Sequence, residues 1–330
     1  MNMQLTVGPI RPPSEAYSLL IRVTKNCPWN RCEFCSVYKG ERFQLRTVQE
    51  VKEDILTARQ WAEDIQKLAD QTGHSAADVA RHNGILWLQD DGVKSAFLQD
   101  SDTLIMKTEP LAEIVEFLRE MFPTLERICS YARAKTLNKK KPEELKRLRE
   151  AGLSRLHAGL ESGDDELLAY IQKGATAEEM VRAGRKAIKA GFELSEYVLT
   201  GLGGRERWKQ HAENTAKVLN RINPRFIRLR TLHLIPGTLL YDKAERDEFH
   251  VNSVEGVLIE VRKLIENLRV TSELISTDHS WNFFMGEVDG KLPEDKTRLL
   301  KSIDQALTEW RLRGEPKRNP FLGSLNRFTI

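Results

Sequence analysis

Strand-like and helix-like segments alternate along most of this chain, and this alternation restricts the possible fold more than any other feature. Apolar segments of strand length occupy residues 16–24, 95–100, 126–134, 154–162, 193–201 and 225–237. Segments of helical periodicity lie between them, and the first of these follows Thr47 and Glu50, which form a capping-box pattern. The pattern predicts an α/β fold in which parallel strands, joined by right-handed crossovers, curl into a partial (β/α)6 barrel of the TIM type.

The composition is that of a globular protein with a sizeable core. The chain has 330 residues, of which 40% are hydrophobic and 30% charged. It contains no run of about 18 apolar residues, and its N-terminal sequence lacks the basic and apolar regions of a signal peptide. We therefore expect a cytoplasmic protein. Its 51 basic and 48 acidic side chains are well mixed, so a nucleic-acid partner is not expected from charge.

Three of the four cysteines lie close together, directly after the first predicted strand, in the stretch KNCPWNRCEFCSVYKG. Cys27, Cys32 and Cys35 have the spacing C-x4-C-x2-C, which allows one loop to place three thiolates around one inorganic centre. A structural zinc site needs four protein ligands, but Cys129 lies far along the chain in another predicted strand. A 4Fe-4S cluster held by three cysteines leaves one iron open, which suggests catalysis. A zinc knuckle completed by a distant ligand, or cysteines without a joint role, are the alternatives.

The stretch CPWNRCEFC resembles the cluster-binding loop of the radical S-adenosylmethionine (SAM) superfamily. In that family three cysteines hold a 4Fe-4S cluster, and an aromatic residue, here Phe34, precedes the last one. The first gap has four residues, whereas three are more common. The segment GLESGDDELLAYIQKG resembles the fourth-strand motif of the branch that contains tRNA methylthiotransferases and oxygen-independent coproporphyrinogen oxidases. The resemblance covers roughly residues 15–245 and implies a partial barrel with the cysteine loop at the C-terminal end of its first strand.

The resemblance also implies contacts to SAM. Glu161, at the end of the fourth strand, would bind the ribose hydroxyls, and Lys173 would pair with the carboxylate. Ile235, after the sixth strand, would contact the adenine. Three residues at the end of the second strand would receive the amino group of SAM: Gln99, Asp100 and Ser101. The alternatives are that Glu161 and Lys173 form only solvated contacts at helix ends, and that the polar segment after the second strand is simply a turn.

Strand alternation predicts a cationic barrel lumen. In RFIRLRTLH, Ile227 and Leu229 face the helices, whereas Arg228 and Arg230 face the lumen. The same alternation adds side chains from the other strands: Arg22, Tyr131, Arg133 and His157. Because the guanidinium group suits carboxylate or phosphate, this lumen predicts an anionic small-molecule substrate, with Arg228, Arg230, Tyr131 and His157 as its candidate contacts. Alternatively, lumen-facing acids such as Glu196 neutralise the arginines.

We predict two domains, the barrel with its N-terminal lead-in over residues 1–245 and a mostly helical extension over residues 246–330 packed on the barrel. The extension contains no cysteine, so a second cluster held by protein thiols is not expected. Its segment DHSWNFF could bring Asp278 and His279 near the substrate. Equally, three aromatic residues of this segment could serve only to dock the extension: Trp281, Phe283 and Phe284.

These features together predict a radical SAM enzyme. As the resemblance implies, a flavodoxin or ferredoxin-type donor would reduce the cluster, and reductive cleavage of SAM would give a 5′-deoxyadenosyl radical that abstracts hydrogen from the substrate. Two alternatives belong to other classes. One is an iron–sulfur redox or iron sensor without SAM turnover, and the other is a zinc-stabilised nucleic-acid module, which the near-neutral charge disfavours.

Overall fold

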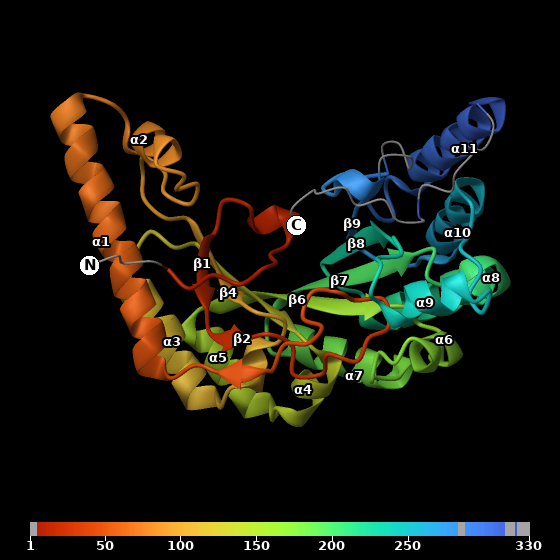
Figure 1. Ribbon diagram of the computed structural model, residues 1–330, viewed down its shortest axis with the longest axis horizontal. Helices are drawn as coiled ribbons and strands as arrows, with labels where there is room; N and C mark the ends of the chain where they lie inside the picture. Colours follow the sequence, from red (N-terminus) through yellow and green to blue (C-terminus); the bar gives the residue numbers. More distant parts are fainter. Residues whose placement is uncertain (1–4, 283–287, 314–320, 322–330) are drawn as a thin grey trace. The chain divides into compact units, whose positions relative to one another are not determined.

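A computed structural model describes residues 5–282, 288–313 and 321 of the chain (Figure 1). The chain divides into two compact units. The first comprises Met1–Pro28, Gly40–His157 and Lys189–Phe192, and the second comprises Trp29–Lys39, Ala158–Ile188 and Glu193–Ile330. The predicted boundary between residues 245 and 246 stays a prediction.

Parallel strands form the central sheet of the first unit. β1 (Leu19–Arg22) pairs with β4 (Ser95–Gln99), which pairs with β5 (Arg127–Ala132), and both pairings are parallel. β6 (Leu153–Glu161) follows β5 in the strand order. A separate antiparallel pair, β2 (Thr24–Lys25) and β3 (Gln44–Leu45), forms the base of the cysteine loop.

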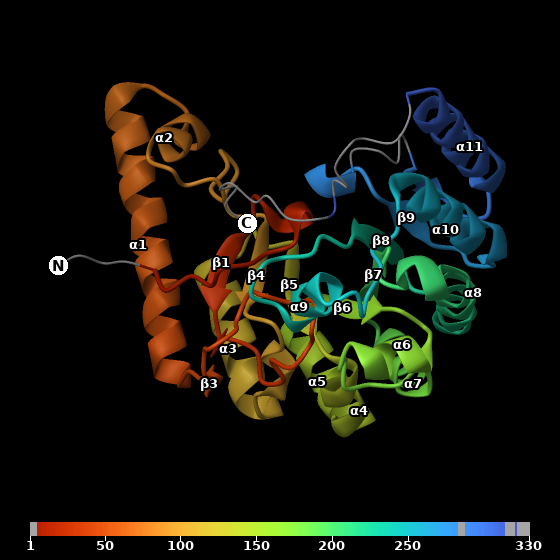
Figure 2. The same cartoon turned by 45° about the vertical axis from the view of Figure 1, so that its right-hand side comes forward.

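The helices of the first unit connect these strands. The long helix α1 begins as the sequence predicts, because Thr47 and Glu50 form a capping box in which each side chain accepts the other's backbone N–H. α2 folds back beside the end of α1, which both views show (Figures 1 and 2). The bounds of the helices are α1 Val48–Thr72, α2 Ala76–His82, α3 Thr108–Met121, α4 Ala134–Lys139 and α5 Pro142–Ala151, with 3-10 turns η1 Pro13–Glu15 and η2 Thr103–Ile105.

The second unit continues the strand order from the end of β6. β7 (Glu193–Thr200) and β8 (Phe226–Thr231) are parallel, and β9 (Glu273–Ile275) adds to β8 in parallel. The short β10 (Gly290–Lys291) is antiparallel to β9. The strand order β1-β4-β5-β6-β7-β8-β9-β10 gives a mostly parallel, eight-stranded sheet. All six predicted strands are present. The sequence does not predict β3, β9 and β10, because each is too short for an alternating pattern.

Helices of the second unit pack against helices that lie far from them in the sequence. Within this unit α10 packs against both α8 and α11 (Figure 2). The helices predicted in the extension are confirmed as α10 and α11. The bounds are α6 Asp165–Tyr170, α7 Ala177–Lys189, α8 Gly204–Ile222, α9 Leu239–Glu245, α10 Val254–Asn267 and α11 Lys296–Arg313, with the 3-10 turn η3 Ser280–Asn282.

Candidate cofactor site

The cysteine loop runs from β2 to β3. The side chains of Cys27, Cys32 and Cys35 are all partly exposed, whereas Cys129 is fully buried in β5. The backbone N–H of Cys35 donates to the carbonyl of Cys32 over 3.3 Å, which closes a tight turn between the second and third thiol. Over the described residues no disulfide joins these cysteines. Three reachable thiols on one loop, with the fourth cysteine buried elsewhere, fit the ligand set of a site-open 4Fe-4S cluster.

A buried aspartate holds the residue that precedes Cys27. Oδ2 of Asp100 accepts the backbone N–H of Asn26 at 2.7 Å, and Nε and Nη2 of Arg22 donate to the same oxygen at 3.0 and 2.8 Å. Ser101 Oγ donates to the carbonyl of Asn26 at 3.2 Å. Asn26 has φ +69°, a left-handed conformation that these bonds stabilise. Arg22, predicted to face the lumen, thus pairs with Asp100.

The amide of Gln99 binds the N-terminal lead-in. Its Oε1 accepts the N–H of Gly8 at 2.8 Å, and its Nε2 donates to the carbonyl of Ile10 at 2.6 Å. Gln99 thus binds the N-terminal lead-in, whereas Asp100 and Ser101 bind Asn26 at the start of the cysteine loop. Their assignment to the amino group of SAM stays a prediction.

Glu161 and Lys173 lie together, as the resemblance implies for two contacts to one cofactor. Lys173 Nζ donates to Glu161 Oε1 at 2.8 Å, and the two side chains are only 14% and 15% exposed, so they are not simply solvated helix-end residues. Glu161 has φ +62° at the last position of β6. Burial raises the pKa of the neighbouring Glu196 to about 8; the charge of Glu161 adds to this increase, whereas Lys173 opposes it.

A buried hydrogen-bond network supports the segment that follows Glu161. Nδ1 of His211 on α8 lies 2.8 Å from Ser162 Oγ, and its Nε2 lies 3.2 Å from the carbonyl of Leu199. Glu260 on α10 accepts the N–H of Gly201 at 2.7 Å. The sequence pattern did not predict the roles of His211 and Glu260. The available signal was a charged residue on an apolar helix face, since Glu260 lies among buried Val257, Leu258, Val261 and Leu264.

Arg228 and Arg230 share one carboxylate. Arg230 donates to Asp278 from Nη1 to Oδ1 at 2.7 Å and from Nη2 to Oδ2 at 3.1 Å, and Arg228 Nη1 donates to Oδ2. Arg228 also donates from Nε to Ser195 Oγ at 3.1 Å. An acid therefore neutralises the two arginines, but it is Asp278 from the loop after β9; the expectation that Glu196 does so is corrected.

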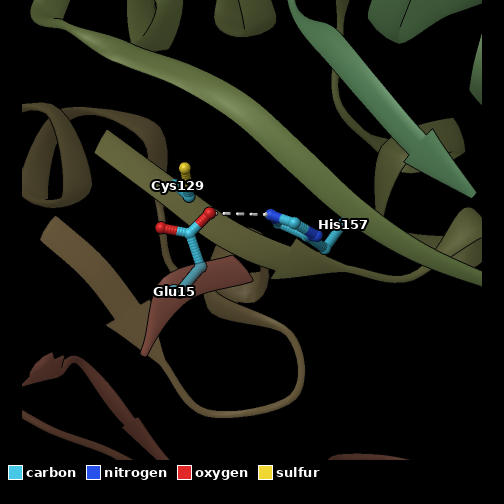
Figure 3. A group of neighbouring side chains, drawn as sticks. All are labelled: Glu15, Cys129 and His157. Carbon is cyan, nitrogen blue, oxygen red and sulfur yellow. Dashed lines mark ion pairs between the residues drawn. The ribbon is translucent and has the colours of Figure 1, made fainter. Parts of the chain in front are cut away.

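Tyr131 and His157 belong to a different environment. Their rings are 6.1 Å apart, and His157 Nε2 lies 3.5 Å from Oε1 of the buried Glu15 (Figure 3). Cys129 Sγ, one carboxylate oxygen of Glu15 and one ring nitrogen of His157 lie within 4.8 Å of one another, a spacing that a metal ion could bridge. Arg127 and Ser18 already bind the other carboxylate oxygen of Glu15, at 3.2 and 2.6 Å. We interpret this group as a charge-balanced part of the core.

The remaining predicted contacts lie on loops. Phe34, within the cysteine loop, is half-buried. Ile235 is half-exposed, and its carbonyl accepts the N–H of Thr238, which caps α9. Burial lowers the pKa of His279, and the nearby Arg230 lowers it further. The predicted docking residues Phe283 and Phe284 lie outside the described residues.

Comparison with known proteins identifies the family. A family model described as the radical SAM superfamily matches residues 21–216, which is more than half of the chain. The chain belongs to the radical SAM superfamily. The predicted family, the enzyme class and the cofactor pair of a 4Fe-4S cluster with SAM are thereby confirmed.

Several individual proteins are similar over part of their length. The heme chaperone HemW of Bacillus subtilis (strain 168) is 23% identical over 161 residues, which are 48% of this chain and 42% of that protein. The structure of coproporphyrinogen III oxidase (HemN) from Escherichia coli superimposes with a TM-score of 0.50 at 16% identity, covering 76% of this chain and 51% of that one. Archaeal Elp3 from Methanocaldococcus infernus gives a TM-score of 0.49 at 14% identity, covering 82% and 57%.

The likeness to coproporphyrinogen III oxidase confirms the fold class predicted from the strand and helix alternation. The chain spans less than half the length of HemW and about half that of this oxidase. Among the helices that the structure describes, none combines the length and apolarity needed to cross a membrane.

Proposed function

We propose that this chain cleaves SAM reductively at a 4Fe-4S cluster held by Cys27, Cys32 and Cys35, and uses the resulting radical to abstract hydrogen from an anionic small molecule. The observation that carries the proposal is the loop of three partly exposed thiols in a chain that belongs to the radical SAM superfamily. A cluster of this type, when bound, supplies the electron that breaks a carbon–sulfur bond of SAM. The fully buried Cys129 is not part of this ligand set.

The chain's own residues bind and orient the cofactor. Lys173 would pair with the SAM carboxylate and Glu161 with the ribose hydroxyls, and their 2.8 Å contact supports a site in which both reach one ligand. Burial keeps the pKa of Glu196 near 8, so this carboxyl is protonated at neutral pH and adds no second negative charge beside Glu161. Phe34 and Ile235 would provide apolar contacts to the adenosyl group.

The arginine pair supports an anionic substrate. Arg228 and Arg230 together bind both oxygens of Asp278, so their guanidinium groups are arranged for one carboxylate. Asp278 is 20% exposed and lies on a loop. We propose that the carboxylate or phosphate of the substrate takes the place of Asp278 on these arginines. Tyr131 remains a proposed substrate contact, whereas the buried His157 belongs to the core group around Glu15.

The electron donor and the location follow from the same proposal. A flavodoxin or ferredoxin-type protein would reduce the cluster, and a reducing cytoplasm would keep the three ligand thiols unoxidised.

Anaerobic reconstitution tests the proposed function. The protein should hold about four irons per chain and, with a strong reductant and SAM, release 5′-deoxyadenosine slowly without substrate. Replacing Cys27, Cys32 or Cys35 with Ala should abolish both, whereas Cys129→Ala should retain them. An intact cluster that yields no deoxyadenosine would favour the iron–sulfur sensor. A colourless protein that contains zinc would favour the zinc-stabilised module.

The anion site can be tested before the substrate is known. Asp278→Asn leaves two arginines without a carboxylate, so citrate or inorganic phosphate should raise the melting temperature of this variant more than that of the wild type. The double variant Arg228→Gln/Arg230→Gln should lose this response. Equal responses in all three proteins would contradict an anion site at the arginine pair.

A further inference from the structure

The second half of the cysteine loop contains a buried acid between two cluster cysteines. Glu33 stands between Cys32 and Cys35 and is only 4% exposed. A buried carboxylate is costly unless its charge and its hydrogen-bonding capacity are satisfied. Residues 29–39 belong to the second unit, together with α6 and α9.

Two segments of the second unit bind the backbone and the carboxylate of Glu33. Its backbone N–H donates to the carbonyl of Ile171 at 2.9 Å, and its own carbonyl accepts the N–H of Leu240 at 3.1 Å. In the side chain, Oε1 accepts Nε2 of Gln172 at 2.7 Å, and Oε2 forms an ion pair with Lys243 Nζ at 2.5 Å. Glu33 therefore joins the loop to the segment after α6 and to α9.

The segment after α6 is also bound by the beginning of the same loop. Trp29 Nε1 donates to the carbonyl of Gln172 at 2.7 Å. Gly174 has φ +76°, and a Cβ there would lie 2.4 Å from the Trp29 ring, so only glycine allows this close approach. Residues 172–174 thus contact Trp29 and Glu33, on both sides of Cys32.

Lys173 lies in the middle of this bound segment. Its neighbour Gln172 contacts both Trp29 and Glu33, and Lys173 itself reaches back to Glu161. Because its hydrogen bonds and ion pair are directional, a buried carboxylate fixes the relative positions of two backbone segments, which an apolar side chain of similar size does not. The contacts of Glu33 therefore tie the backbone that carries Cys32 and Cys35 to the backbone that carries Lys173.

We propose that Glu33 is a positioning residue that fixes Lys173 relative to Cys32 and Cys35. The ammonium group that binds the SAM carboxylate then keeps a fixed position relative to the cluster ligands. This inference rests on the proposed function, because it takes Lys173 as a SAM contact. Lys243 supplies the counter-charge that makes a buried carboxylate tolerable in the loop.

Glu33→Gln is the informative variant, because it keeps an oxygen for Gln172 and removes the charge opposite Lys243. The matched control is Glu248→Gln in the same unit, since Glu248 is half-exposed and pairs with the exposed Arg246. Both variants of the full chain are reconstituted anaerobically. The rate of iron release to a chelator, the Kd for SAM, the change that SAM causes in the electron paramagnetic resonance spectrum, and the melting temperature are then measured.

Glu33→Gln should retain the iron content of the wild type but bind SAM about tenfold more weakly and release iron about tenfold faster, since one partner of a buried ion pair is lost. Its melting temperature should fall modestly, because Lys243 loses its buried partner, whereas its iron content should not fall. SAM should perturb its spectrum less. Glu248→Gln should match the wild type in all four measurements. Lys243→Arg, which keeps the charge, should retain most of the SAM affinity.

Two results would overturn the inference. One is a Glu33→Gln variant with the SAM affinity and iron release of Glu248→Gln. The other is a parallel fall in melting temperature, iron content and affinity, which indicates a purely structural role. If Glu33→Gln does not assemble, Lys243→Gln removes the same ion pair from α9 and must show the same two effects. A wild-type protein without cluster or SAM binding would instead contradict the proposed function.

Discussion

Two buried glutamates of this protein have pKa values shifted in opposite directions, although neither side chain is more than 2% exposed. Glu15, on η1 of the first unit, has its pKa lowered to about 2: burial raises it, but bonds from His157 and Ser18 and the charge of Arg127 outweigh burial. Glu260, on α10 of the second unit, has its pKa raised to about 8, because burial dominates and only the N–H of Gly201 opposes it. The partners, and not the depth of burial, decide the charge of a buried acid here.

His211, which lies beside Glu260, does not give this glutamate a charged partner. His211 Nε2 lies 3.4 Å from Glu260 Oε1, but burial lowers the pKa of His211 to about 4. Between about pH 4 and 8 both His211 and Glu260 are therefore neutral. Glu15, by contrast, carries its charge throughout this range and needs the guanidinium of Arg127. Glu15 is thus half of a buried ion pair, whereas Glu260 and His211 form a buried neutral network.

Removing the charge of Glu15 should lower the free energy of unfolding more than any other change proposed for these two glutamates. Glu15→Gln leaves Arg127 without its buried partner, and we expect a loss of about 3 kcal/mol in the free energy of unfolding at pH 7, measured with urea on cluster-free protein. Glu126→Gln, at the exposed residue beside Arg127, is the control and should unfold like the wild type. Equal stability of the two variants would mean that Glu15 is not an ion-pair partner.

Lowering the pH should remove the stabilisation that the charged Glu15 gives to the wild type. Because the folded pKa of Glu15 lies below its ordinary value of 4.5, the unfolded chain binds this proton first, and stability falls as the pH drops from about 4.5 to 2. The part due to Glu15 should be about 3 kcal/mol, and it should be absent from Glu15→Gln. Urea unfolding of both proteins from pH 5 to 2.5 gives the difference; parallel curves would contradict the lowered pKa.

Glu260 should show the opposite dependence on pH. Its folded pKa is raised, so its contribution is complete at low pH and is lost as the pH rises from about 4.5 through 8. Between pH 6.5 and 8, above the titration of His211, the wild type should lose about 2 kcal/mol relative to Glu260→Gln. A wild type that is stabilised over this range would indicate an ionised Glu260 paired with a charged His211.

Ser18→Ala should have the smallest effect. The Ser18 hydroxyl donates to Glu15 Oε2 and lies 2.7 Å from Ser95 Oγ, while Arg127 continues to bind the carboxylate in the variant. We expect a loss of about 1 kcal/mol, the usual value for one buried hydrogen bond. A loss as large as that of Glu15→Gln would show that Ser18, more than Arg127, holds the carboxylate.

The sequence predicted the elements well because their signals are local. The six main strands, the capping box of α1 and the two long helices of the extension were all visible as short patterns. Strand alternation also placed Arg228 and Arg230 on one face, opposite the fully buried Ile227 and Leu229. The cysteine loop predicted the cofactor, because the resemblance of CPWNRCEFC to the cluster-binding loop of the radical SAM superfamily is a local pattern.

The pairing of charges could not be predicted in this way. The acid for Arg228 and Arg230 is Asp278, about fifty positions away on the loop after β9, and not Glu196 on the neighbouring strand. No local pattern distinguishes Glu33, and only the folded second unit brings it to Lys243.

The sequence by itself thus determined the succession of strands and helices, the thiol loop and the cationic face of β8, since each depends on residues within a few positions of one another. The tertiary structure alone decided which acid meets which base, and therefore whether a buried glutamate is ionised, as Glu15 is, or neutral, as Glu260 is. The physical reason is that a buried charge is stabilised by a few atoms within about 4 Å, and the fold gathers these atoms from distant parts of the chain.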